Sequence, residues 1–152
     1  MSATDPTERR KMDPGTLRDE WVSRLSDLTR SVRRWAEELD WSTRQIGKKM
    51  KDSRLGTYEA PALIMQKGTT RVLLDPVARF APSADGVVDL YLMPAYDDIA
   101  SLFFVNGEWR LHYTSPGTTA VAEIKEAESR ALSKEALGQV LDEMSTHAAE
   151  TL

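Results

Sequence analysis

Apolar residues recur at spacings of three and four between residues 17 and 39, which is the pattern of a helix with one buried face. These positions predict a helix of about 25 residues. A Ser-x-x-Gln sequence at residues 42–45 has the form of a capping box and favours a second short helix with Ile46 and Met50 facing inward. A single helix kinked near residue 41 is the alternative. The apolar positions of the first helix are Leu17, Trp21, Leu25, Leu28, Val32, Trp35 and Leu39.

From residue 58 the pattern changes to the alternation of strands, in which every second side chain is apolar. Residues 58–66 and 70–75 flank Lys67-Gly68 and predict a hairpin with glycine at the turn. Pro61 has no amide hydrogen to donate, so we expect the first of these strands to lie at an edge or to begin after it. Further strands are predicted at residues 87–93, 99–105 and 108–114, and a weaker one at 119–125.

The last pattern is again helical and follows Ser133, a residue type that favours helix N-termini. Leu132 before this cap and Leu137 after it have the spacing of a hydrophobic staple. The whole order predicts an α+β fold: a long N-terminal helix, a five- or six-stranded, largely antiparallel meander, and a C-terminal helix packed on one sheet face. Residues 1–15 contain little to bury, so we expect a flexible arm before a single domain at 16–152.

Asn106-Gly107 lies between two of the predicted strands and is a strong signal for a two-residue hairpin turn. Such a turn places Val105 opposite Glu108 and fixes every pair further along the strands. One face then carries apolar pairs and should be buried, whereas the other carries the mixed pairs Phe103–Arg110 and Ser101–His112. The expected buried pairs are Phe104–Trp109, Leu102–Leu111 and Ala100–Tyr113.

The preceding strand is aligned less firmly, by matching its apolar residues with those of the next strand. Setting Leu90 opposite Leu102 puts Tyr91 beside Ser101 and Asp89 beside Phe103. The mixed face is then either a solvated sheet face with favourable cross-strand pairs or a binding face for a protein partner. The candidate binding residues are Asp89, Tyr91, Phe103, Arg110 and His112.

Composition narrows the class of protein without naming its function. The 152 residues contain no cysteine and two histidines, and no motif typical of a catalytic, metal or cofactor site is present. We therefore expect a soluble, cytoplasmic, non-enzymatic binding or regulatory domain, either a monomer or a small homo-oligomer. No apolar run is long enough to span a membrane.

Two other functions have some support in the sequence. Asp89, Asp97, Asp98 and Glu108 could hold a divalent metal in a phosphodiesterase or nuclease-like site. Residues 44–54 carry five basic side chains against one acidic one, Asp52, and could bind nucleic acid or an anionic surface. The net charge of −4 argues against nucleic acid as a partner. Trp41 lies off the apolar stripe and is a candidate contact residue.

Overall fold

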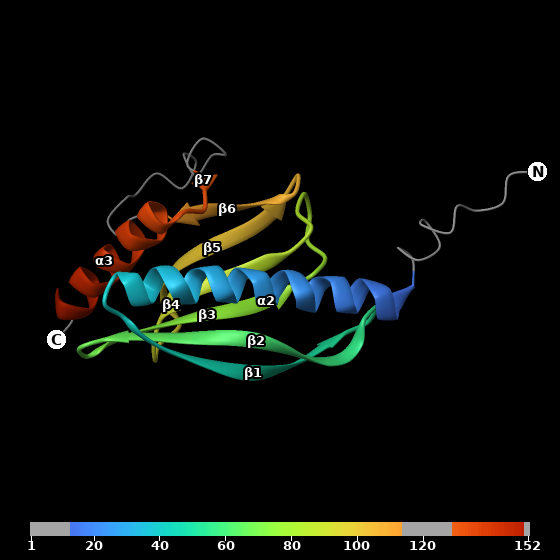
Figure 1. The fold of residues 1–152 in the computed structure, drawn as a ribbon, viewed down its shortest axis with the longest axis horizontal. Helices are drawn as coiled ribbons and strands as arrows, with labels where there is room; N and C mark the ends of the chain where they lie inside the picture. Colours follow the sequence, from blue (N-terminus) through green and yellow to red (C-terminus); the bar gives the residue numbers. More distant parts are fainter. Residues whose placement is uncertain (1–12, 114–128, 151–152) are drawn as a thin grey trace, which may run out of the picture.

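The computed structural model describes residues 13–113 and 129–150, which run helix, seven strands, helix (Figure 1). The long helix comes first and the shorter one last, as the sequence predicts. The elements are α2 (Pro14–Glu38), β1 (Ser42–Asp52), β2 (Gly56–Lys67), β3 (Thr70–Ala78), β4 (Val87–Leu92), β5 (Asp97–Val105), β6 (Glu108–Tyr113), β7 (Arg130–Ala131) and α3 (Lys134–Glu150).

The strands form one sheet in the order in which they occur along the chain, and every neighbouring pair is antiparallel. This is the predicted α+β meander, with slightly more strands than expected. One additional strand is β1 and another is the two-residue β7 at the opposite edge. The strand predicted at residues 119–125 lies outside the described residues.

Helix α2 begins where its sequence provides a cap. The Asp13 carboxylate accepts a hydrogen bond of 3.1 Å from the amide of Gly15, and Pro14 occupies the first turn, where its missing N–H costs nothing. The helix ends at Glu38, and Asp40 then takes a positive φ of 69° that turns the chain back toward the sheet. The predicted stripe is confirmed, since Trp21, Leu25, Leu28 and Val32 are buried.

The segment after α2 corrects the sequence-based interpretation. Residues 42–52 form neither a second helix nor the continuation of a kinked one: they are strand β1 and pair with β2 from end to end. Antiparallel pairing along the whole segment bonds the backbone groups that face β2, and it overrides a helix preference that is weak for each residue. Trp41, 4 % exposed, belongs to the core and is therefore not the contact residue we expected.

Strand β2 also differs from the prediction. It begins at Gly56, before Pro61, and it lies between β1 and β3, so it is not the edge of the sheet. Pro61 is nevertheless tolerated, because it lies opposite Gly47 in a stretch where β2 pairs with β1 alone. The pairing with β3 starts only at Leu63.

Helix α3 has the predicted cap. The Ser133 hydroxyl accepts a hydrogen bond of 3.1 Å from the amide of Ala136, and Leu132 packs against the core just before it. The buried face of the helix carries Leu137, Leu141 and Met144. Neither described helix combines the length and the apolar character that crossing a membrane requires.

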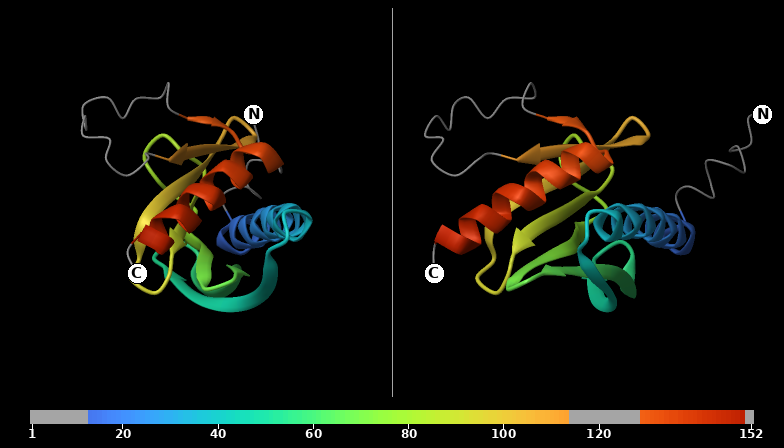
Figure 2. Two further views of the ribbon diagram at one scale, coloured as in Figure 1. Left: turned by 90° about the vertical axis from the view of Figure 1, so that its left-hand side faces the viewer. Right: turned by 60° about the vertical axis from the view of Figure 1, so that its left-hand side comes forward.

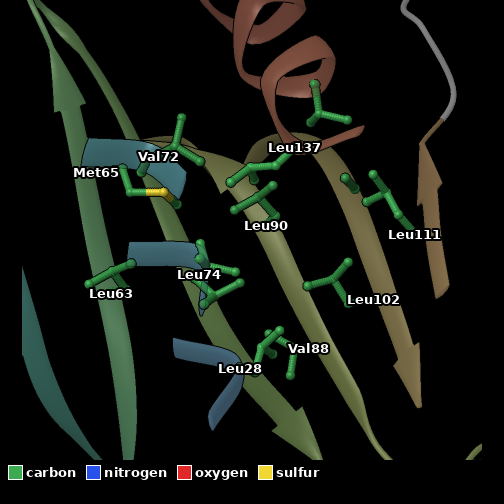
Figure 3. Close-up of a cluster of buried hydrophobic side chains, with 14 of the residues drawn as sticks. Leu28, Leu63, Met65, Val72, Leu74, Val88, Leu90, Leu102, Leu111 and Leu137 are labelled. Carbon is green, nitrogen blue, oxygen red and sulfur yellow. The ribbon is translucent and has the colours of Figure 1, made fainter. Parts of the chain in front are cut away.

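One buried cluster joins both helices to one face of the sheet, which we call the inner face. Leu28 of α2 and Leu137 of α3 contribute to it together with residues from β2 to β6 (Figure 3). The sheet curves beneath α2, while α3 lies across the later strands (Figure 2). The opposite, outer face is therefore covered by neither helix. Strand residues of the cluster include Leu63, Met65, Val72, Leu74, Val88, Leu90, Leu102 and Leu111.

Candidate functional site

The β5–β6 hairpin has the predicted register. Asn106 and Gly107 both take positive φ, 52° and 81°, as the tight two-residue turn requires, and Val105 lies opposite Glu108. Leu102 and its partner Leu111 face the core, so the alternate residues lie on the outer face. Three of the predicted site residues, Phe103, Arg110 and His112, are thus placed as expected.

The β4–β5 register differs from the prediction by two residues. Asp89 lies opposite Ser101 rather than beside Phe103, and Val87 takes the place opposite Phe103. The cause is a connection between the strands that is shorter than the apolar matching assumes, because Leu92 already pairs with Asp97. One extra residue of β5 between Asp97 and Ala100, where Asp98 has a left-handed φ of 51°, offsets part of this difference. The length of such a connection cannot be counted from a pattern of apolar matches. One predicted row becomes Asp89–Ser101–His112, and the other becomes Val87–Phe103–Arg110.

A hydrogen-bonded group surrounds Asp89 on the outer face. One carboxylate oxygen, Oδ1, accepts from the Ser101 hydroxyl at 3.3 Å, and the other, Oδ2, accepts from the Tyr96 hydroxyl at 2.6 Å. The Tyr96 ring packs on that of Tyr91, with ring centres 4.3 Å apart. The hydrogen bond to Asp89 raises the pKa of Tyr96 to about 12, because it favours the protonated phenol beside a carboxylate.

The polar row continues onto β3 and β1. Asp75 lies opposite Asp89, and the Lys48 ammonium donates to Asp75 Oδ1 at 2.7 Å and to the Pro76 carbonyl at 2.8 Å. Burial raises the pKa of the Tyr91 hydroxyl, and the neighbouring Asp75 raises it further. Lys48 therefore offsets one of two adjacent carboxylates, which would otherwise repel each other across the strands.

A hollow of about 670 Å³ lies at the hairpin end of the outer face, and we call it the Phe103 hollow. Phe103 and Val105 form part of its apolar lining, and Arg110 and His112 part of its polar lining. Arg110 is held in place: Nη2 donates to the Ser129 carbonyl at 2.8 Å and Nη1 lies 3.4 Å from a Glu108 oxygen. The five predicted residues thus separate into two groups, the Phe103 hollow and the Asp89–Tyr91 group.

The four carboxylates considered for a metal do not meet. Asp98 lies on the helix side, only 2 % exposed, where it accepts from the Tyr113 hydroxyl at 2.8 Å and faces His147 Nδ1 at 3.3 Å. Asp89 is on the outer face, and Glu108 pairs with Arg110 at the hairpin. Among the residues that the structure describes, no group of three or more acidic or histidine side chains could hold a metal ion.

The basic segment at residues 44–54 does not present one cationic face. It was expected on a helix, but most of it is strand β1, where consecutive side chains point to opposite sides. Lys48 and Lys49 therefore diverge, and Lys48 is engaged by Asp75. Arg54 lies beyond the strand, with its guanidinium 4.5 Å from the centre of the Phe80 ring.

Comparisons with known protein families, with curated protein sequences and with solved structures found no match for this chain.

Proposed function

We propose that this chain is a non-enzymatic binding domain that holds a protein partner on its outer sheet face, at the Phe103 hollow. The main support is the position of α2 and α3, which both pack on the inner face. In the described part of the chain this leaves the hollow, with its aromatic floor, open to an incoming chain. Aromatic and arginine side chains are the ones enriched in protein interfaces.

The chemistry of the hollow suits a segment with one apolar side chain and polar neighbours. Phe103 and Val105 supply apolar surface, and His112 supplies an imidazole that can donate or accept a hydrogen bond. Arg110 is already positioned by Ser129, so little side-chain freedom is lost when a partner binds. Arginine is one of the residue types that are enriched in interface hot spots.

The Asp89–Tyr91 group extends this surface along the same face. Its members are fixed to one another by the hydrogen bonds of Asp89 and by the packing of Tyr96 on Tyr91. Tyr96 is 52 % exposed, so it can contact a partner while its hydroxyl stays bonded to Asp89. We expect this group to form the polar rim of the interface and to contribute less affinity than the hollow.

The test compares capture by matched baits from a lysate of the source cells. Phe103→Ser alters the hollow, whereas Ile46→Ser alters an exposed apolar residue on the distant edge strand β1. Proteins held by the unmodified chain and by Ile46→Ser, but lost by Phe103→Ser, are the expected partners. Titration of the purified partner should then show affinity at least about tenfold weaker for Phe103→Ser, which corresponds to 1.4 kcal/mol.

Thermal melts of both variants show whether each of them is folded, so that the capture experiment compares folded proteins. Capture of the same proteins, with the same affinity, by Phe103→Ser and the unmodified chain would overturn the proposal. So would equal losses with Phe103→Ser and Ile46→Ser, because an interface confined to the hollow predicts a difference.

A further inference from the structure

A second hollow lies on the other side of the molecule, between the polar side of α2 and the β5–β6 hairpin. Its volume is about 780 Å³, which is within the range of ligand-binding clefts and large enough for a few side chains. The link into α3 closes one end through Ala131 and Leu132. We call this hollow the acidic groove. It shares only Glu108 with the lining of the Phe103 hollow.

The floor of the acidic groove is aromatic and rigid. Phe104 and Trp109 pack edge to face with ring centres 5.1 Å apart, and Trp109 also packs on the buried Trp21 at 6.4 Å. Trp35 and Leu28 of α2 complete the apolar lining. Rings held in this way present a fixed apolar surface to a ligand, with little loss of side-chain freedom on binding.

The rim of the groove is negatively charged. Four carboxylates line it, those of Asp19, Glu20, Asp27 and Glu108, against the single guanidinium of Arg24. Asp27 and Glu108 each have a basic neighbour, Arg30 and Arg110, whereas Asp19 and Glu20 have no basic group within 4.0 Å in the described chain. The rim therefore carries an excess of negative charge.

Arg24 belongs to the wall of the groove, and its single charge, which interacts with Glu20 among others, offsets only part of the charge of the four rim carboxylates. Its guanidinium lies 4.1 Å from the centre of the Phe104 ring and donates to the Asp85 carbonyl at 2.9 Å. Burial lowers the pKa of Arg24, and the nearby Arg79 lowers it further. The Arg24 guanidinium is thus already held by contacts within this chain, to the Phe104 ring and to the Asp85 carbonyl.

We propose that the acidic groove binds a short cationic amphipathic segment of another protein. An apolar side chain of the segment would lie on the floor formed by Phe104 and Trp109, and its lysine or arginine side chains would lie along Asp19 and Glu20. Charge complementarity selects this occupant, because an acidic or neutral segment would leave the excess carboxylates unpaired. This site is separate from the outer face and does not depend on the function proposed for it.

The probe is a synthetic peptide of lysine and leucine with helical amphipathic spacing, added to the full chain. Two control peptides have the same length: one replaces lysine by glutamate, and the other replaces leucine by serine. The readout is the set of indole N–H signals in a nitrogen-15 NMR spectrum. We expect the lysine–leucine peptide to shift the signals of Trp35 and Trp109 and to leave that of the buried Trp41 unchanged.

Matched charge reversals distinguish binding in the groove from a general effect of the protein's net charge on peptide binding. Glu20→Lys should weaken the peptide at least about fivefold, whereas Asp142→Lys, on the exposed side of α3, should change its affinity less than about twofold. Phe103→Ser should have no effect, so failure here and failure of the outer-face proposal can be distinguished.

Three results would overturn the assignment: equal binding of the glutamate–leucine peptide, equal binding of the lysine–serine peptide, or equal weakening by Glu20→Lys and Asp142→Lys. A sedimentation experiment tests whether a second copy of this chain occupies the groove instead of the proposed segment. If the chain forms a dimer whose dissociation shifts the Trp109 signal, the groove holds a second copy of the chain and the proposed occupant is wrong.

Discussion

The two faces of the sheet are built from the same strands but are stabilised in different ways. The inner face is apolar and closed by two helices, and Leu102 there is 1 % exposed. The outer face, one residue further along β5, is held by hydrogen bonds and an ion pair between side chains. Free energy of unfolding is therefore concentrated on one face, and substitutions on the other can be interpreted as effects on binding.

Adjacent residues of β5 give the largest contrast between the faces. Leu102→Ala removes a buried side chain and leaves a cavity, so we expect it to lower the free energy of unfolding by about 3 kcal/mol. Phe103→Ala removes a partly exposed side chain and should cost about 1 kcal/mol. Urea unfolding measures both values. Equal losses would contradict the assignment of the two residues to different faces.

The second contrast tests how closely the inner face is packed. A Cβ at residue 86 would lie 2.5 Å from Trp21 Cζ3, and Trp21 is fully buried, so Gly86→Ala should lower the free energy of unfolding by about 2 kcal/mol. Gly138→Ala is the control: its Cβ would lie 3.4 Å from Leu39 Cδ1, and alanine favours a helix.

We expect Gly138→Ala to be neutral or stabilising by up to about 1 kcal/mol. Thermal denaturation of both variants would measure the difference. A Gly86→Ala protein as stable as the unmodified chain would show that α2 can move away from the sheet.

A smaller effect concerns the helix that closes one end of the inner face. Ser133→Ala removes the oxygen that accepts from the Ala136 amide and should lower the free energy of unfolding by about 1 kcal/mol. Thr146→Ala serves as the reference, because within the described residues its hydroxyl bonds only to the Asp142 carbonyl, on an exposed part of the same helix. We expect that change to stay within about 0.5 kcal/mol, measured by urea unfolding.

The smallest expected effect is on the titration of the tyrosines. It distinguishes the hydrogen-bonded outer face from a sheet face whose side chains contact only water. All four tyrosines of the chain, Tyr58, Tyr91, Tyr96 and Tyr113, have a raised pKa, so less phenolate absorbance should appear near pH 10 than four free tyrosines would give. Asp89→Asn should move the pKa of Tyr96 from about 12 back toward 10. Ultraviolet absorbance, compared with a Tyr96→Phe variant, assigns the change to this residue.

The raised pKa of Tyr96 also determines how the free energy of unfolding depends on pH. The raised pKa of Tyr96 means that the folded chain favours the protonated phenol. Its stabilising contribution is complete below pH 10 and is lost as the pH rises from 10 toward 12. If the stability of Tyr96→Phe changed with pH in this interval as that of the unmodified chain does, the bond to Asp89 would have no role in it.

The parts of the fold that could be predicted are those fixed by local sequence. Asn106-Gly107 determines its own turn, so the β5–β6 pairs follow by counting. The stripe of α2 and the cap of α3 are local in the same sense. The strand β1 is different, because residues 42–52 contain helix-favouring side chains, and their strand conformation depends on pairing with β2.

The same distinction explains which site residues were missed. Lys48 reaches Asp75 only because β1 is a strand, and Tyr96 reaches Asp89 only because the β4–β5 connection folds onto the outer face. Neither contact has a signal within its own segment. Residues 42–52 show no regular alternation of apolar and polar side chains that would have predicted a strand.

The meander order has a consequence for how the chain folds during synthesis. Each strand pairs with the strand that precedes it, so the sheet can grow one hairpin at a time and needs few contacts between distant parts of the sequence. Helix α2 leaves the ribosome before the strands of the sheet, and the ring of its Trp21 is enclosed only after Gly86 has been synthesised. We therefore expect an early intermediate with an exposed apolar helix, which chaperones would recognise until β4 has been synthesised.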